Sequence, residues 1–146
     1  MNIKTIIAGI LAAIAFFLLG WLIWGMLLMD TMNQYSNAAC MKPEEEMNMA
    51  YLVVANLLFG LIYAYIFSNW SGPKSFSSGL LPGALINIVI GAGYDFFMLS
   101  MTTMHTSTTV VGINIIPNAV VGAIVGGIVC WWLGRDGGSR GIQNPN

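Results

Sequence analysis

Four runs of mainly apolar residues constrain this chain more than any other feature. They cover roughly residues 6–29, 49–67, 80–101 and 113–133. Each is close to the length of about 20 residues that an α-helix needs to cross the hydrocarbon core of a bilayer. The sequence therefore predicts an all-α fold, with a single transmembrane domain of four helices over residues 1–133. We expect residues 134–146, which are polar and rich in glycine, to form a flexible cytoplasmic tail.

The composition agrees with a lipid environment and argues against several function classes. Only 8% of the 146 residues are charged and 57% are hydrophobic, whereas soluble domains carry about a quarter charged residues. Little chain remains outside the four runs for a soluble catalytic domain. The sequence contains no phosphate-binding glycine loop, no Ser/His/Asp arrangement and no basic patch for nucleic acid. We therefore expect a non-enzymatic protein without catalytic residues, whose surroundings are the lipid bilayer.

The basic residues predict an orientation, because lysine and arginine are enriched in cytoplasmic loops. Lys4, Lys74, Arg135 and Arg140 fall on the side that holds both ends of the chain, and Lys42 falls on the other side. Both termini are therefore expected in the cytoplasm. The first apolar run is longer than the 7–15 residues of a cleavable signal segment, so we expect it to remain as a span.

Small residues recur at intervals of four along the last three runs, which is the spacing that lets helix backbones approach closely in lipid. This pattern predicts helix packing through Gly60, Gly83, Gly91, Gly122 and Gly126. The same pattern suits a contact within one chain or a contact with a second copy or another membrane subunit. Both interpretations remain open at the level of sequence.

Asp95 is the one acidic residue well inside a predicted span, and such residues are costly enough in lipid to suggest a function. Asn56, Asn114 and Asn118 fall in the same outer half, so the pattern predicts an intramembrane polar cluster. The carboxyl group could form a structural hydrogen bond with these asparagines, hold a proton or cation, contact Lys42 or bind a metal. The outer half could contain either an outward-facing cavity or a dry hydrogen-bonded plug.

Methionines gather toward the outer ends of the predicted helices. Apart from the first residue, all of the 10 methionines lie on this side of the chain. Thioether and imidazole ligands favour Cu(I), but methionine is also a flexible filler of irregular packing. The candidate copper ligands are Met98, Met101, Met104, His105, Met26, Met29 and Met32. No other cofactor is indicated.

The segment Gly20-Trp21-Leu22-Ile23-Trp24-Gly25, followed by Met29-Asp30, resembles a segment late in the first helix of a family of small bacterial four-helix membrane proteins of unknown function. A looser likeness extends over residues 118–127. The resemblance implies a four-span fold in the bacterial inner (cytoplasmic) membrane. It implies no activity and no catalytic residue.

Three functional hypotheses follow from these patterns. The first is association through helices, as an accessory subunit of a membrane complex or as a homo-oligomer. The second is Cu(I) handling by the methionines and His105. The third is binding of a small solute or a lipid in an outward-facing polar cavity around Asp95.

Overall fold

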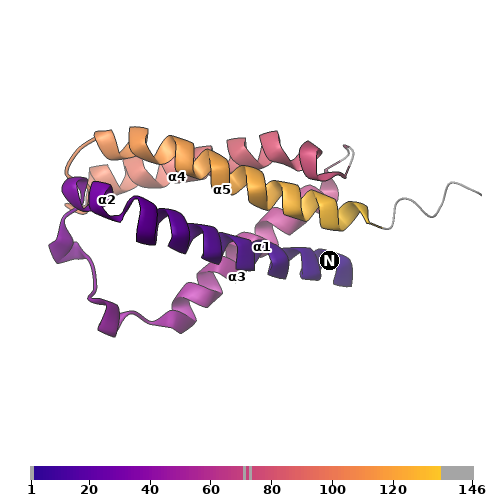
Figure 1. The fold of residues 1–146 in the computed structure, drawn as a ribbon, viewed down its shortest axis with the longest axis horizontal. Helices are drawn as coiled ribbons and strands as arrows, with labels where there is room; N and C mark the ends of the chain where they lie inside the picture. The colour runs from indigo at the N-terminus through magenta and orange to yellow at the C-terminus, as the bar shows by residue number, and fades with distance from the viewer. Residues whose placement is uncertain (1, 71, 73, 136–146) are drawn as a thin grey trace, which may run out of the picture.

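The computed structural model describes residues 2–70, 72 and 74–135, and within these ranges helices are joined by short connections and the only β structure is one isolated bridge. The prediction of an all-α bundle is confirmed (Figure 1). The elements are α1 (Ile3–Leu22), the π-helix η1 (Ile23–Leu27), α2 (Met29–Tyr35), the 3-10 turns η2 (Ala38–Cys40) and η3 (Glu44–Glu46), α3 (Met49–Asn69), α4 (Phe76–Met101) and α5 (Thr109–Gly134).

Four helical segments in the described ranges are long and apolar enough to cross a membrane, so the chain is a multi-pass membrane protein. They are Ile3–Leu27, Met49–Asn69, Phe76–Met101 and Thr109–Gly134. The helix α4 begins four residues before its predicted span because Ser75 and Ser78 form a capping box that stabilises a polar first turn. Gly134, predicted to begin the tail, is the last residue of α5; residues 136–146 of that tail lie outside the described residues.

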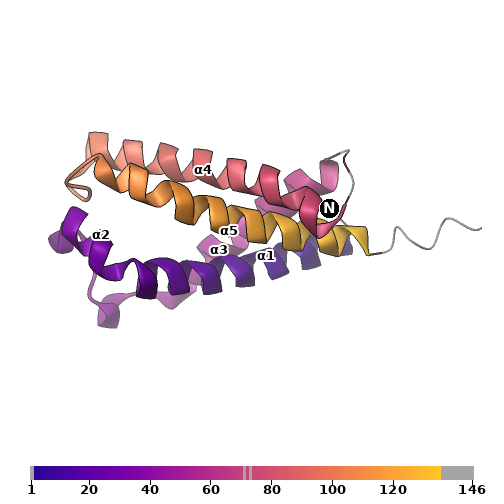
Figure 2. The same ribbon diagram turned by 45° about the horizontal axis from the view of Figure 1, so that its top comes forward.

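The helices form two closely packed pairs that meet along α5. The helices α4 and α5 run side by side along their lengths, while α1 packs against both α3 and α5 (Figures 1 and 2). The helix α3 crosses α1 diagonally, so its first half diverges from α4 and α5. The start of α1 and the end of α5 lie at one end of the bundle, and α2 and the α4–α5 loop lie at the other.

Glycines allow both pairs to approach backbone to backbone. A Cβ atom added at Gly83 would overlap the backbone of Gly122, and one added at Gly126 would overlap the backbone of Gly79. At the crossing of α1 and α3, a Cβ atom at Gly60 would overlap the backbone of Gly9. The glycine ridges predicted from the sequence are thus packed within the chain itself.

We expect Gly83→Ala to lower the free energy of unfolding by about 1–3 kcal/mol, because the new methyl group must push α4 and α5 apart. Unfolding in detergent, followed by circular dichroism, measures this change. Gly93→Ala is the matched control in the same helix, since nothing lies within 4 Å of a Cβ atom there. Equal stability of the two variants would contradict the close α4–α5 contact.

Candidate functional site

The final turn of the first span is a π-helix, η1, which ends in a kink at Leu28. The backbone N–H of Leu28 donates to the carbonyl of Ile23 at 2.7 Å. Single π-helical turns are rare and occur often at functional sites. The indole nitrogen of Trp24, within this turn, donates to Oδ1 of Asn114 in α5 at 2.9 Å.

Asn114 links three helices through the two ends of its amide. Its Oδ1 accepts the Trp24 hydrogen bond, and its Nδ2 donates to Oδ2 of Asp95 in α4 at 2.8 Å. Asp95 is only 5% exposed. A buried carboxyl group without a partner would be very unfavourable in lipid, so this hydrogen bond is central to the half of the bundle that is nearest to α2 and the α4–α5 loop.

His105 lies against the other oxygen of Asp95. Its Nε2 is 3.4 Å from Asp95 Oδ1, and both side chains are buried. Neither ring nitrogen of His105 makes a hydrogen bond in the described part of the chain.

The segment after α2 holds His105 in place. Ser36 and His105 form an isolated antiparallel β-bridge. The N–H of Asn37 donates to the carbonyl of Met104 at 2.8 Å, and the N–H of Thr106 donates to the carbonyl of Tyr35 at 2.9 Å. The α4–α5 loop is therefore fastened to the end of α2, which closes the outer end of the bundle.

A second layer of amides lies one turn deeper. Asn118 Nδ2 donates to the carbonyl of Asn114 at 2.9 Å, and Asn87 Nδ2 donates to both the carbonyl and Oδ1 of Asn118, at 2.9 and 3.1 Å. Gly91 faces the Asn118 amide, which a Cβ atom there would overlap. The structure thus brings Asp95, Asn114 and Asn118 together through α4 and α5.

Asn56 does not join this network. Its Nδ2 donates to the carbonyl of Leu52 in its own helix at 2.8 Å. It lines a neighbouring cavity instead, because the diagonal path of α3 carries it away from α5.

This cavity of about 440 Å³ lies between α1, α3, α4 and α5. Its walls are aromatic and aliphatic side chains with three amides among them. The lining residues are Phe16, Trp24, Asn56, Phe59, Asn87, Ile90, Gly91, Tyr94, Asn118 and Val121. Asp95 does not belong to the lining. Asp95 lies beside Asn114 and His105 instead, and solute binding around this carboxyl group stays a prediction.

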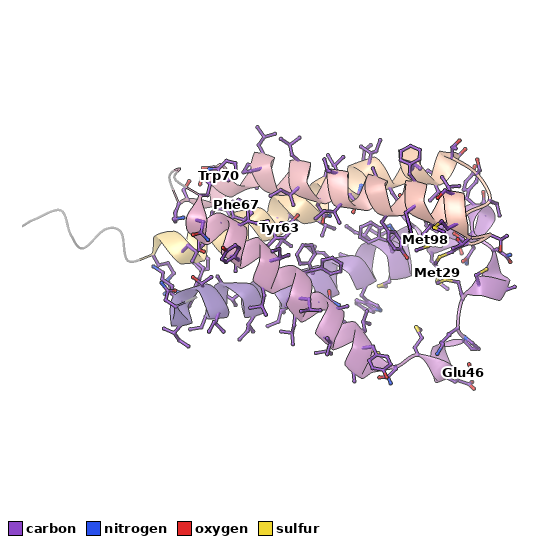
Figure 3. All side chains as sticks on the ribbon, turned by 180° about the vertical axis from the view of Figure 1, so that it is seen from behind. Met29, Glu46, Tyr63, Phe67, Trp70 and Met98 are labelled. Atoms are coloured by element: carbon purple, nitrogen blue, oxygen red, sulfur yellow. The ribbon has the colours of Figure 1, made fainter. Side chains whose placement is uncertain are left out.

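The predicted copper ligands all lie in the outer part of the structure, but their exposure varies. Met26, Met29 and Met101 are about half exposed or more, while Met32, Met98 and Met104 are half-buried. Met29 and Met98 appear at the same end of the bundle in Figure 3. Among the described residues, no group of three or more His, Cys, Asp or Glu side chains could hold a metal. Copper binding stays a prediction.

Sequence reasoning missed two members of the polar network. One is Trp24, whose bond to Asn114 depends on the π-helical turn. His105 was grouped with the methionines. The signal that could have placed it is the short connection between α4 and α5, which returns a residue near its middle toward the last turns of α4.

No family model, curated protein or solved structure matches this chain. The resemblance to small bacterial four-helix membrane proteins therefore stays a prediction.

We expect Asn114→Leu to lower the free energy of unfolding by about 1–3 kcal/mol, because it leaves the Asp95 carboxyl group and the Trp24 indole without this partner. Asn56→Leu is the matched control, since its amide bonds only to its own helix, and we expect a change within about 0.5 kcal/mol. Chemical unfolding in detergent measures both. Two equally mild effects would contradict a central role for Asn114.

Proposed function

We propose that this chain is a non-enzymatic membrane protein that binds a single-chain amphipathic molecule taken up sideways from the lipid. The observation that carries the proposal is the cavity mouth, which lies between α3 and α4 within two candidate membrane spans. The exposed lining residues are Phe59 of α3, at 48%, and Ile90 and Tyr94 of α4, at 43% and 52%.

The position of these residues along their helices supports a mouth that faces the hydrocarbon region. Residues 56 and 59 lie in the first half of α3 (Met49–Asn69), and residues 87–94 lie near the middle of α4 (Phe76–Met101). The opposite wall is deep, since Val121 of α5 is only 2% exposed. An occupant that enters here comes from the bilayer.

The size and chemistry of the cavity suit such an occupant. Its volume of about 440 Å³ falls within the range of about 300–1,000 Å³ that is typical of small-molecule sites. Mostly apolar walls with a few placed polar groups are also typical of these sites. The amides of Asn56, Asn87 and Asn118 would orient a polar group while the aromatic rings contact an apolar chain.

The polar network would then lie toward the outer face of the membrane. Lys4 lies in the first turn of α1, Arg135 follows the last residue of α5, and Lys74 contacts Gly134 at the end of α5. The excess of basic residues in cytoplasmic loops supports a cytoplasmic position for this end and for both termini. A bacterial inner membrane is part of the same proposal and is supported by the resemblance of the first span.

Association with another subunit or a second copy has less support. It was motivated by the glycine ridges, but Gly79, Gly83, Gly122 and Gly126 pack against one another within the chain. A helix of another subunit could contact the first half of α3, which diverges from α4 and α5. Such a contact would exclude lipid from the cavity.

The test uses protein reconstituted into vesicles that contain oleyl alcohol and oleyl methyl ether in equal amounts. Native mass spectrometry after extraction counts the total of both adducts. We expect a bound molecule on the native protein and a large loss in Ile90→Trp, whose indole would occupy the cavity. Val89→Trp is the matched control, because Val89 is the adjacent residue, is 71% exposed and does not line the cavity.

Two results would contradict the proposal. One is the absence of any adduct on the native protein. The other is equal binding by the Ile90→Trp and Val89→Trp variants, which would place the bound molecules on the general lipid-facing surface.

A further inference from the structure

The amide of Asn87 is fixed in an orientation that leaves only an acceptor for a ligand. Its Nδ2 donates to the backbone carbonyl of Asn118 at 2.9 Å and to Asn118 Oδ1 at 3.1 Å. A backbone carbonyl can only accept, so the nitrogen must face it. Both N–H groups of Asn87 are thus used within the protein.

The oxygen of the same amide has no partner. Asn87 Oδ1 accepts no hydrogen bond from the described residues and is not enclosed by protein. Asn87 is one of the residues that line the cavity, so the cavity is the space from which a ligand can reach this oxygen. Any ligand group that satisfies it must donate a hydrogen bond.

Asn56 offers a second acceptor on the opposing helix. Its Nδ2 faces the backbone carbonyl of Leu52 at 2.8 Å, which fixes this amide in the same way. Its Oδ1 accepts no hydrogen bond in the described part of the chain. Acceptors from α3 and α4 therefore line the same cavity.

The lining contains no charged side chain. An ammonium group would be desolvated there without a counter-charge, which is strongly unfavourable. An ester, ether or ketone has no donor and would leave the Asn87 oxygen unpaired, at the desolvation cost of a buried acceptor. A hydroxyl group is neutral, supplies the donor and can also accept from the remaining N–H groups of Asn56 and Asn118.

We infer that the cavity selects a lipid alcohol, whose hydroxyl group donates to Oδ1 of Asn87 while its hydrocarbon chain lies along the aromatic wall. This inference rests on the proposed function and names the ligand class for the same site. The interaction takes place in a low-dielectric environment, where an unpaired polar group costs more free energy than it does in water.

The test is the ratio of the two adducts in the experiment with equal oleyl alcohol and oleyl methyl ether. The two probes differ only by replacement of the hydroxyl hydrogen with a methyl group, so native mass spectrometry resolves them by mass. We expect the native protein to favour the alcohol about fivefold, which corresponds to about 1 kcal/mol.

Asn87→Leu removes the acceptor. We expect binding of the alcohol to fall to the level of the ether while ether binding persists, which separates a lost hydrogen bond from a misfolded protein. Where this variant fails to fold, the ratio on the native protein decides the question alone.

Equal binding of both probes to the native protein would overturn the hydroxyl inference and leave the proposed function standing, provided that Ile90→Trp still blocks both. An unchanged preference for the alcohol in folded Asn87→Leu would also overturn it. Loss of both adducts from the native protein would instead refute the proposed function itself.

Discussion

The hydrogen bond from Asn114 to Asp95 is the interaction on which the half of the bundle nearest to α2 depends. A carboxyl group within a membrane span has no water to satisfy it, so its burial requires partners supplied by the protein. Asn114 provides one partner and, through its oxygen, also anchors Trp24 of the π-helical turn. His105 lies 3.4 Å from the other oxygen and is itself held by the segment after α2. The network around this one carboxyl group therefore connects the first span, α4, α5 and two connecting segments.

Two features determine the position of the cavity: the bridge between the end of α2 and the α4–α5 loop, and the close glycine contacts between helices. The helices α4 and α5 approach backbone to backbone through Gly83 and Gly122, which leaves no space between them at that level. The helix α3 is held against α1 at Gly60 and contacts α4 deeper in the bundle, where the Tyr63 hydroxyl donates to the carbonyl of Gly83 at 3.1 Å. Its diagonal course separates its first half from α4. The remaining space lies between these two helices and faces lipid.

The parts of this structure that were predictable from sequence are those that depend on local composition. Apolar runs of sufficient length predicted the helices, because backbone groups in lipid must bond within their own segment. The spacing of four residues between small side chains identified Gly122 and Gly126 as packing residues. The high cost of a carboxyl group in lipid identified Asp95 as a member of a polar cluster. Which helix meets which could not be read from these patterns. Asn56 and Asn118 line the same cavity, but α3 packs on α1 at Gly60 and the Asn56 amide bonds only to its own helix.

His105 and Trp24 illustrate a second limit. A histidine in a loop and a tryptophan near a membrane interface are both common, and neither position indicates a contact with another side chain. Their contacts with Asp95 and Asn114 depend on a backbone bridge between two loops and on a single widened helical turn. Neither feature has a residue pattern of its own in this chain.

The central claim is that the cavity opens to the lipid and is closed to water at its outer end. A nitroxide label at Ile90→Cys, in protein whose native cysteines are replaced by serine and reconstituted into vesicles, tests this claim by collision with oxygen and with a water-soluble nickel complex. A label at Cys40, in a second protein in which only Cys130 is replaced by serine, provides the reference for contact with water, because Cys40 is exposed in the connection between α2 and α3. The structure predicts strong relaxation of the label at position 90 by oxygen and little by nickel. Nickel accessibility equal to that at position 40 would show a water-filled cavity and contradict the account.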